Sequence, residues 1–147
     1  MIILHELGVV IEVVKTVEKF SKENNIEKID TLVLQIGELS SIIPKYIEDI
    51  YAAAVVGTML QDTKLEIEIL PGNGMCRKCN KVFNLIENKN KCPNCGSENW
   101  EILCGKEFMI KEIIVFWNIT HNTTAIPVKI EYQTFYLNWN CCFLIEN

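Results

Sequence analysis

Apolar residues recur at intervals of three and four positions in two stretches of the chain. The first stretch runs from Leu7 to Phe20, with charged residues between its apolar positions. It predicts an amphipathic helix that ends near Asn24 and Asn25. The second begins near Pro44, a residue suited to the first turn of a helix, and is expected to stop near Gly57. Its buried face is predicted to contain Ile47, Ile50, Tyr51, Ala54 and Val55.

Three other stretches have the pattern of strands. Residues 31–37 are rich in β-branched and apolar residues and end in glycine, and residues 65–70 alternate strictly between apolar and charged. Residues 108–116 form a third strand-like run. The order is helix, strand, helix, strand, a cysteine-rich segment, and strand. It predicts an α+β fold with two helices packed on a small three-stranded sheet, in which the two strands that flank the inserted segment pair in one sheet.

The inserted segment contains two CxxC pairs. Cys76 and Cys79 are followed, after twelve residues, by Cys92 and Cys95. This spacing is typical of one tetrahedral zinc ion held by four thiolates, and Gly96 allows the backbone to turn tightly beside the second pair. Four thiolates leave no open position for water, so the predicted Zn(II) is structural. The alternative is four buried or redox cysteines without a metal.

Composition limits the function classes. The 147 residues carry a net charge of -5, and Arg77 is the only arginine. This argues against a nucleic-acid partner. No apolar run of about 18 residues predicts a membrane span, and the N-terminus does not have the pattern of a secretory signal. We therefore expect a cytoplasmic protein, in which disulfides are rare and a metal explains the paired cysteines.

The N-terminus is a second candidate site. His5 and Glu6 are expected immediately before the first helix. Glu6 there favours the positive end of the helix dipole, and His5 is either a solvent-facing residue or a transition-metal ligand. Imidazole suits zinc, copper and nickel, and a planar, nitrogen-rich site favours copper or nickel. No pair of nucleophile and base, and no phosphate-binding glycine loop, indicates an enzyme.

Several short motifs occur together in order: His5-Glu6-Leu7, residues 35–40 with Pro44, residues 65–68, the two CxxC pairs with Pro93 and Gly96, and residues 110–113. In this order and spacing the chain resembles the HypA/HybF nickel metallochaperones over about residues 4 to 116. The resemblance implies an α+β nickel-binding domain with an inserted zinc module, and Ni(II) carried for the maturation of [NiFe] hydrogenases. Its implied partners are a nickel-loading GTPase and the hydrogenase large subunit. Whether the chain forms a homodimer is left open.

The resemblance also assigns residues. His5 and Glu6 match the nickel-binding histidine of the family and the acidic residue after it, and the four cysteines match its structural zinc ligands. The family's nickel ligands are nitrogens of the imidazole, of backbone amides and of the terminal amine. We therefore expect a discontinuous nickel-binding α+β domain (residues 1–73 plus 106–116), a zinc-binding module (74–105) and an atypical C-terminal extension (117–147), for which disorder is one interpretation.

Two features depart from the family pattern. The family begins Met-His-Glu, whereas residues 1–4 precede the histidine here, so we expect translation to begin at position 4. The extension has an aromatic-rich, weakly charged composition, and its His121, Cys141 and Cys142 are potential metal ligands. Cys104 is expected to be a packing residue, because four cysteines already fill the zinc shell. The alternative function is a zinc-ribbon module that binds nucleic acid or another protein.

Overall fold

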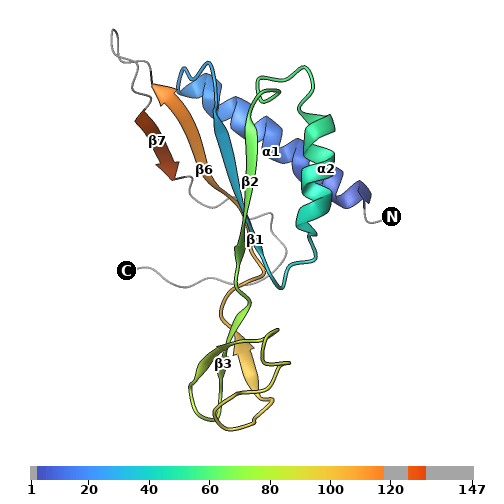
Figure 1. The fold of residues 1–147 in the computed structure, drawn as a ribbon, viewed down its shortest axis with the longest axis vertical. Helices are drawn as coiled ribbons and strands as arrows, with labels where there is room; N and C mark the ends of the chain where they lie inside the picture. Colours follow the sequence, from blue (N-terminus) through green and yellow to red (C-terminus); the bar gives the residue numbers. More distant parts are fainter. Residues whose placement is uncertain (1–2, 118–125, 132–147) are drawn as a thin grey trace.

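The computed structural model describes residues 3–117 and 126–131, with side chains described for residues 6–115. The described residues form two helices and seven strands, and the strands belong to two separate sheets. The larger sheet is covered on one face by the helices, and the smaller sheet lies beyond the ends of its strands (Figure 1). Neither of the two described helices combines the length and the apolar character needed to cross a membrane.

Helix α1 (Ile3–Glu23) follows the predicted amphipathic pattern. Its buried apolar side chains are valines that enter the main core: Val9, Val10, Val13, Val14 and Val17. The helix ends where the sequence predicts, because both the backbone N–H and the side-chain amide of Asn24 donate to the carbonyl of Phe20. Asn25 then adopts a positive φ of 54°, a conformation that asparagine tolerates better than most residues.

Helix α2 (Pro44–Ala54) connects two parallel strands, β1 (Thr31–Gly37) and β2 (Lys64–Leu70). Pro44 occupies the first turn, where its missing N–H removes no helical hydrogen bond. Ile47, Tyr51 and Val55 are buried, and Ile50 and Ala54 pack partly against the same core. The predicted inner face of this helix is therefore confirmed.

Strand β1 lies inside the larger sheet, between β2 and the antiparallel strand β6 (Phe108–Trp117). Leu32, Leu34 and Ile36 of β1 are almost fully buried in the core that the helices cover. The strands on either side of the cysteine-rich segment, β2 and β6, share the sheet as expected. They each pair with β1 rather than with one another, because the crossover through α2 places β2 on one edge of β1 and leaves the other edge to β6.

The larger sheet has four strands and not the expected three. Strand β7 (Ile126–Glu131) pairs antiparallel with the outer edge of β6. The sequence signal is an alternation of Ile126, Val128 and Ile130 with polar residues, and Pro127 is tolerated because β7 is an edge strand. Part of the expected C-terminal extension thus belongs to the sheet. Residues 118–125 and 132–147 lie outside the described residues.

The cysteine-rich segment forms the smaller sheet, with β3 (Asn73–Cys76) between β4 (Val82–Asn84) and β5 (Trp100–Ile102). We call residues 74–105 the four-cysteine module and the rest of the described chain the α+β domain. The module follows β2 and precedes β6, and Figure 1 shows it below the helices and the larger sheet. The predicted α+β fold with an inserted four-cysteine module is confirmed.

Candidate metal centre

The first CxxC pair lies on a tight turn at the end of β3. The N–H of Cys76 donates to the carbonyl of Lys81 at 2.9 Å, and the N–H of Asn80 donates back to the carbonyl of Cys76 at 2.8 Å. Asn80 adopts a positive φ of 58°, which closes the turn. These contacts direct the sulfurs of Cys76 and Cys79 to the same side of the loop.

The second CxxC pair repeats this geometry. The N–H of Cys92 donates to the carbonyl of Ser97 at 2.9 Å, and the N–H of Gly96 donates to the carbonyl of Cys92 at 2.8 Å. Gly96 has a φ of 71° and stands four residues after Cys92, as Asn80 stands four residues after Cys76. The predicted turn at Gly96 is therefore present, and Asn80 is its counterpart in the first knuckle.

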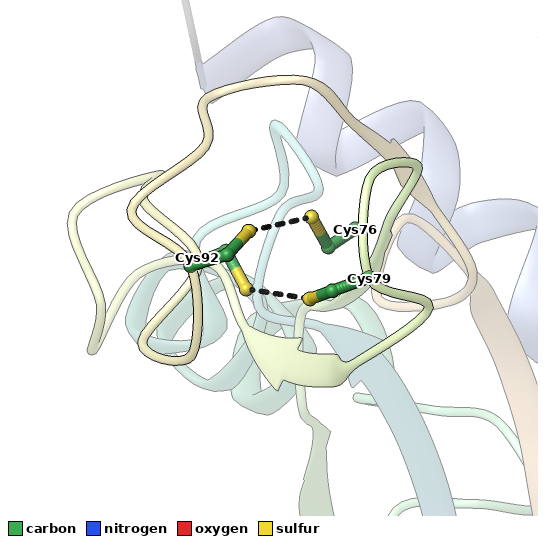
Figure 2. A group of neighbouring side chains, drawn as sticks. Cys76, Cys79 and Cys92 are labelled. Carbon is green, nitrogen blue, oxygen red and sulfur yellow. Dashed lines mark hydrogen bonds between the residues drawn. The ribbon is translucent and has the colours of Figure 1, made fainter.

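The two knuckles bring all four sulfurs together. The Sγ atoms of Cys76, Cys79, Cys92 and Cys95 lie within 4.8 Å of one another. The Cys76–Cys95 and Cys79–Cys92 sulfurs are 3.6 and 3.5 Å apart, and Figure 2 shows three of these side chains converging on one point. Zinc–sulfur bonds of about 2.3 Å in a tetrahedron place sulfurs about 3.8 Å apart. This donor set fits zinc.

The surroundings of Cys79 favour its thiolate form. Hydrogen bonds from the Asn94 side chain and, next in size, from the Lys81 backbone N–H lower the pKa of Cys79 below its usual range. A thiolate is the form of cysteine that binds metals. Burial of Cys76 and Cys92 also keeps solvent from the two sulfurs nearest the module's interior.

The apolar core of the module is small. Cys76, Cys92, Phe83 and Leu85 are buried, and Trp100 packs beside them while its indole N–H donates to the carbonyl of Asn90 at 2.8 Å. Two of the four residues in that buried set are themselves cysteines. A core of this size gives only marginal stability without a crosslink. We therefore expect metal binding and folding of the module to be coupled.

Four charged residues of the module form two local ion pairs. Arg77 contacts Glu101 at 3.0 Å, and Lys91 contacts Glu98 at 3.0 Å. All four side chains are well exposed, so these pairs contribute little to stability. Local charge balance accounts for two of the module's five basic residues.

Cys104 lies outside the sulfur cluster. Its Sγ is 3.4 Å from the carbonyl of Pro71, where the chain passes between the module and the α+β domain. Of the other potential ligands named from the sequence, His121, Cys141 and Cys142 lie outside the described residues.

The N-terminal candidate site differs from its sequence prediction in position. Helix α1 begins at Ile3, so His5 and Glu6 lie in its first turn and not before it. Glu6 is almost fully buried, at 1% exposure, and its Oε2 atom has no hydrogen-bond partner among the described residues. The apolar spacing could not reveal this, because the helical pattern was read from Leu7 onward. A buried, unpartnered carboxylate oxygen is costly and is therefore a feature to explain.

The sequence reasoning missed residues that shape the metal centre. Asn80 carried a weak signal, since asparagine is the residue other than glycine that most readily adopts positive φ. The contact of Asn94 with Cys79 had no signal beyond its place between Cys92 and Cys95. Glu38, which joins the module to the sheet, was visible only as part of a family motif.

Comparison with protein families gives one extended match. A model described as "Hydrogenase/urease nickel incorporation, metallochaperone, hypA" matches residues 4–115. The matched range includes His5, Glu6 and all four cysteines of the cluster, and it ends within β6.

Curated proteins give similar results. A hydrogenase maturation factor HypA from Geobacter sulfurreducens is 33% identical over 112 residues, which are 76% of this chain and 99% of that protein. The corresponding factor from Dechloromonas aromatica is 33% identical over 110 residues, covering 75% of this chain and 97% of that protein. Each match therefore spans nearly all of the relative and about three quarters of this chain.

Solved structures agree on the fold. The chain is similar to the solution structure of the Ni metallochaperone HypA from Helicobacter pylori, with a TM-score of 0.53 and 24% identity, over 75% of this chain and 96% of that one. A second solution structure of a HypA protein gives a TM-score of 0.58 at 24% identity, over 76% of this chain and 96% of that one. At this identity the likeness concerns the arrangement of the elements.

Proposed function

Because the chain belongs to the HypA family of nickel-incorporation metallochaperones, we propose that it carries Ni(II) at its N-terminus and delivers it to the large subunit of a [NiFe] hydrogenase. The observation that carries this proposal is the family match itself, which begins at residue 4 and so includes His5 and Glu6. The family description names both hydrogenase and urease, and the curated relatives are hydrogenase maturation factors. Hydrogenase is therefore the preferred client.

The first turn of α1 supplies suitable donors for nickel. His5 offers an imidazole, and the first backbone N–H groups of a helix have no intrahelical acceptor. Imidazole nitrogens suit Ni(II), which readily takes a planar arrangement of nitrogen ligands. Ligation by backbone amides would require this first turn to unwind, which costs little at a helix end where few helical hydrogen bonds exist.

Glu6 supports the same site from inside the domain. Its buried Oε2 has no hydrogen-bond partner among the described residues. A cation bound beside it would offset the free-energy cost of burying that unpartnered oxygen. We propose that Glu6 favours nickel binding at His5 by this electrostatic contribution, either as a ligand or as its neighbour.

The four-cysteine module would hold Zn(II) as a structural ion. Cys76, Cys79, Cys92 and Cys95 complete a tetrahedral shell, and a filled shell has no position for a reacting water. Zinc would supply a crosslink between the two knuckles. The cysteines themselves orient the loops, and their turns at Asn80 and Gly96 set the direction of the sulfurs.

The proposed partners follow from the same family membership. A nickel-loading GTPase would act with the chain, the hydrogenase large subunit would receive the metal, and both would be met in the cytoplasm.

Nickel titration of zinc-loaded protein tests the proposal. We expect His5→Ala to abolish most nickel binding and Glu6→Gln to weaken it about 10–100-fold, the usual effect of losing a supporting group around a metal. Two matched controls are His121→Ala, which removes the only other histidine, and Glu12→Gln, which removes an exposed carboxylate of the same helix. All variants should retain about one zinc per chain, since the four thiolates are unchanged. Equal nickel binding by the wild type and His5→Ala would contradict the proposal.

The residues before His5 allow a second test. A chain in which the initiating methionine replaces residues 1–4 places the terminal amine one residue from His5 and restores the family's Met-His-Glu start. We expect this shortened chain to bind nickel more tightly than the full chain, because a further nitrogen comes within reach of the metal. Tighter binding by the full chain would argue against the terminal amine as a ligand.

A further inference from the structure

Three chain segments meet between the four-cysteine module and the α+β domain. We call them the waist: residues 37–39 at the end of β1, residues 70–73 from the end of β2 to the start of β3, and residues 103–107 before β6. Backbone hydrogen bonds of 2.7 to 2.9 Å join them, namely Gly37 N–H to Glu107 O, Leu39 N–H to Gly105 O, and Glu38 N–H to Leu70 O. The connection is therefore a hydrogen-bonded crossing of three segments and not a pair of free linkers.

Glycines allow the three segments to touch. A Cβ added at Gly37 would lie 2.1 Å from the carbonyl oxygen of Gly105, and one added at Gly105 would lie 2.5 Å from the Cα of Gly72. Gly105 also has a φ of 107°, which side chains disfavour. The backbones are thus in direct contact, at a separation that leaves no room for a side chain.

Glu38 crosses this waist with its side chain. Its Oε2 accepts a hydrogen bond from the backbone N–H of Gly72 at 2.8 Å and another from Nδ2 of Asn84, in β4 of the module, at 2.8 Å. Both bonds lower the pKa of Glu38, and the bond from Gly72 has the larger effect. The carboxylate is therefore charged at neutral pH while it contacts both sides of the waist.

The module presents Asn84 in a fixed orientation. The Oδ1 atom of Asn84 accepts hydrogen bonds from the backbone N–H groups of Ile86 and Glu87, both at 2.9 Å. Its Nδ2 donor is consequently directed to Glu38. The next residue along the chain, Leu39, packs against the module's own core beside Cys79 and Trp100. Two residues that follow β1, Glu38 and Leu39, thus contact the module.

We propose that Glu38 is a positioning residue that fixes the orientation of the four-cysteine module relative to the α+β domain, through the donor of Asn84. This goes beyond the proposed nickel carriage and does not depend on it. The contact connects the end of β1, an interior strand of the larger sheet, with β4 of the module. The backbone bonds of the waist remain when the Glu38–Asn84 bond is removed. The loss of that bond should therefore leave each part folded and widen the range of their relative orientations.

Residual dipolar couplings of the zinc-loaded full chain measure this orientation. In the wild type, backbone amides of β1 and of β3 should fit one alignment tensor. In Asn84→Asp the hydrogen bond is replaced by repulsion between the introduced carboxylate and that of Glu38. The couplings of the module should then fit a separate alignment tensor of smaller magnitude. Glu12→Gln is the control, because it removes an exposed carboxylate whose ion pair is with Lys15 of the same helix.

A double variant separates positioning from damage to the fold. In the wild type the Oε2 atom of Glu38 accepts both bonds. In Glu38→Gln combined with Asn84→Asp, a rotation of the introduced amide lets its oxygen accept from Gly72 while its nitrogen donates to the introduced carboxylate, so the bond across the waist is restored with its polarity reversed. We expect the single tensor to return. Two tensors in the wild type, or one tensor in Asn84→Asp with an unchanged zinc content, would overturn the proposal. So would failure of the double variant to recover the common orientation while both parts remain folded.

Discussion

Tyr51 is buried in the main core with a hydroxyl that has no hydrogen-bond partner among the described residues. Burial raises its pKa to about 12. Because an unpartnered buried hydroxyl costs free energy, Tyr51→Phe should leave the free energy of unfolding unchanged or raise it by up to about 1 kcal/mol. Ile47→Ala, one turn away, should lower it by about 2–5 kcal/mol through a cavity. Urea unfolding measures both, and a loss above 1 kcal/mol in Tyr51→Phe would reveal a hydrogen bond that the geometry lacks.

Gly96 isolates the cost of a positive φ in the metal knuckle. A Cβ there would meet nothing within 4 Å, so Gly96→Ala introduces backbone strain without a clash. The strain is about 1–2 kcal/mol, and coupling of folding to metal binding turns it into a zinc affinity about tenfold lower. Competition with a chelator measures this affinity. Gly8→Ala is the control, since its Cβ is equally free and its φ is helical, and its zinc affinity should equal that of the wild type.

At the scale of secondary structure, periodicity predicted the elements that bury one face. Local chemistry that is visible in the sequence predicts the C-terminal end of α1 beside Asn24, the start of α2 at Pro44 and the span of β1. Strand β7 was missed because its alternation is short, begins beside a proline and is surrounded by residues without a period. The start of α1 was placed too late, since a helix's first turn has no repeat to reveal it. The burial of Glu6 followed from that and could not be foreseen.

The pairing of β7 with β6 gives a prediction at the same scale. The family match ends at residue 115, before β7, and β7 covers the outer edge of β6. A chain ending at Trp117 should keep its circular dichroism and its zinc. It should also self-associate more strongly with concentration, because an uncovered edge strand presents unpaired N–H and C=O groups. Sedimentation velocity measures this, and equal association of the two chains would show that β7 does not protect the edge.

At the scale of the whole molecule, two separate cores divide the stability of the chain. The α+β domain buries sixteen hydrophobic residues in one cluster, whereas the module buries four residues, two of them cysteines. The spacing of the cysteines was enough to predict the metal centre, because four thiolates at two CxxC turns need no distant partner. The waist could not be predicted, because the contacts of Glu38 join residues 34 and 46 positions apart and have no repeat or spacing of their own.

This division predicts a partial unfolding when the metal is removed. A strong chelator should abolish amide exchange protection in β3, β4 and β5, because the module's core is too small to persist without its crosslink. Protection in α1 and β1 should remain, since their core contains none of the cysteines. The effect should also appear on acidification, where protons compete with zinc for the thiolates. If chelation instead removed protection throughout the chain, the backbone contacts at Gly37, Gly72 and Gly105 would have to carry stability from the module into the α+β domain, and the two cores would be one cooperative unit.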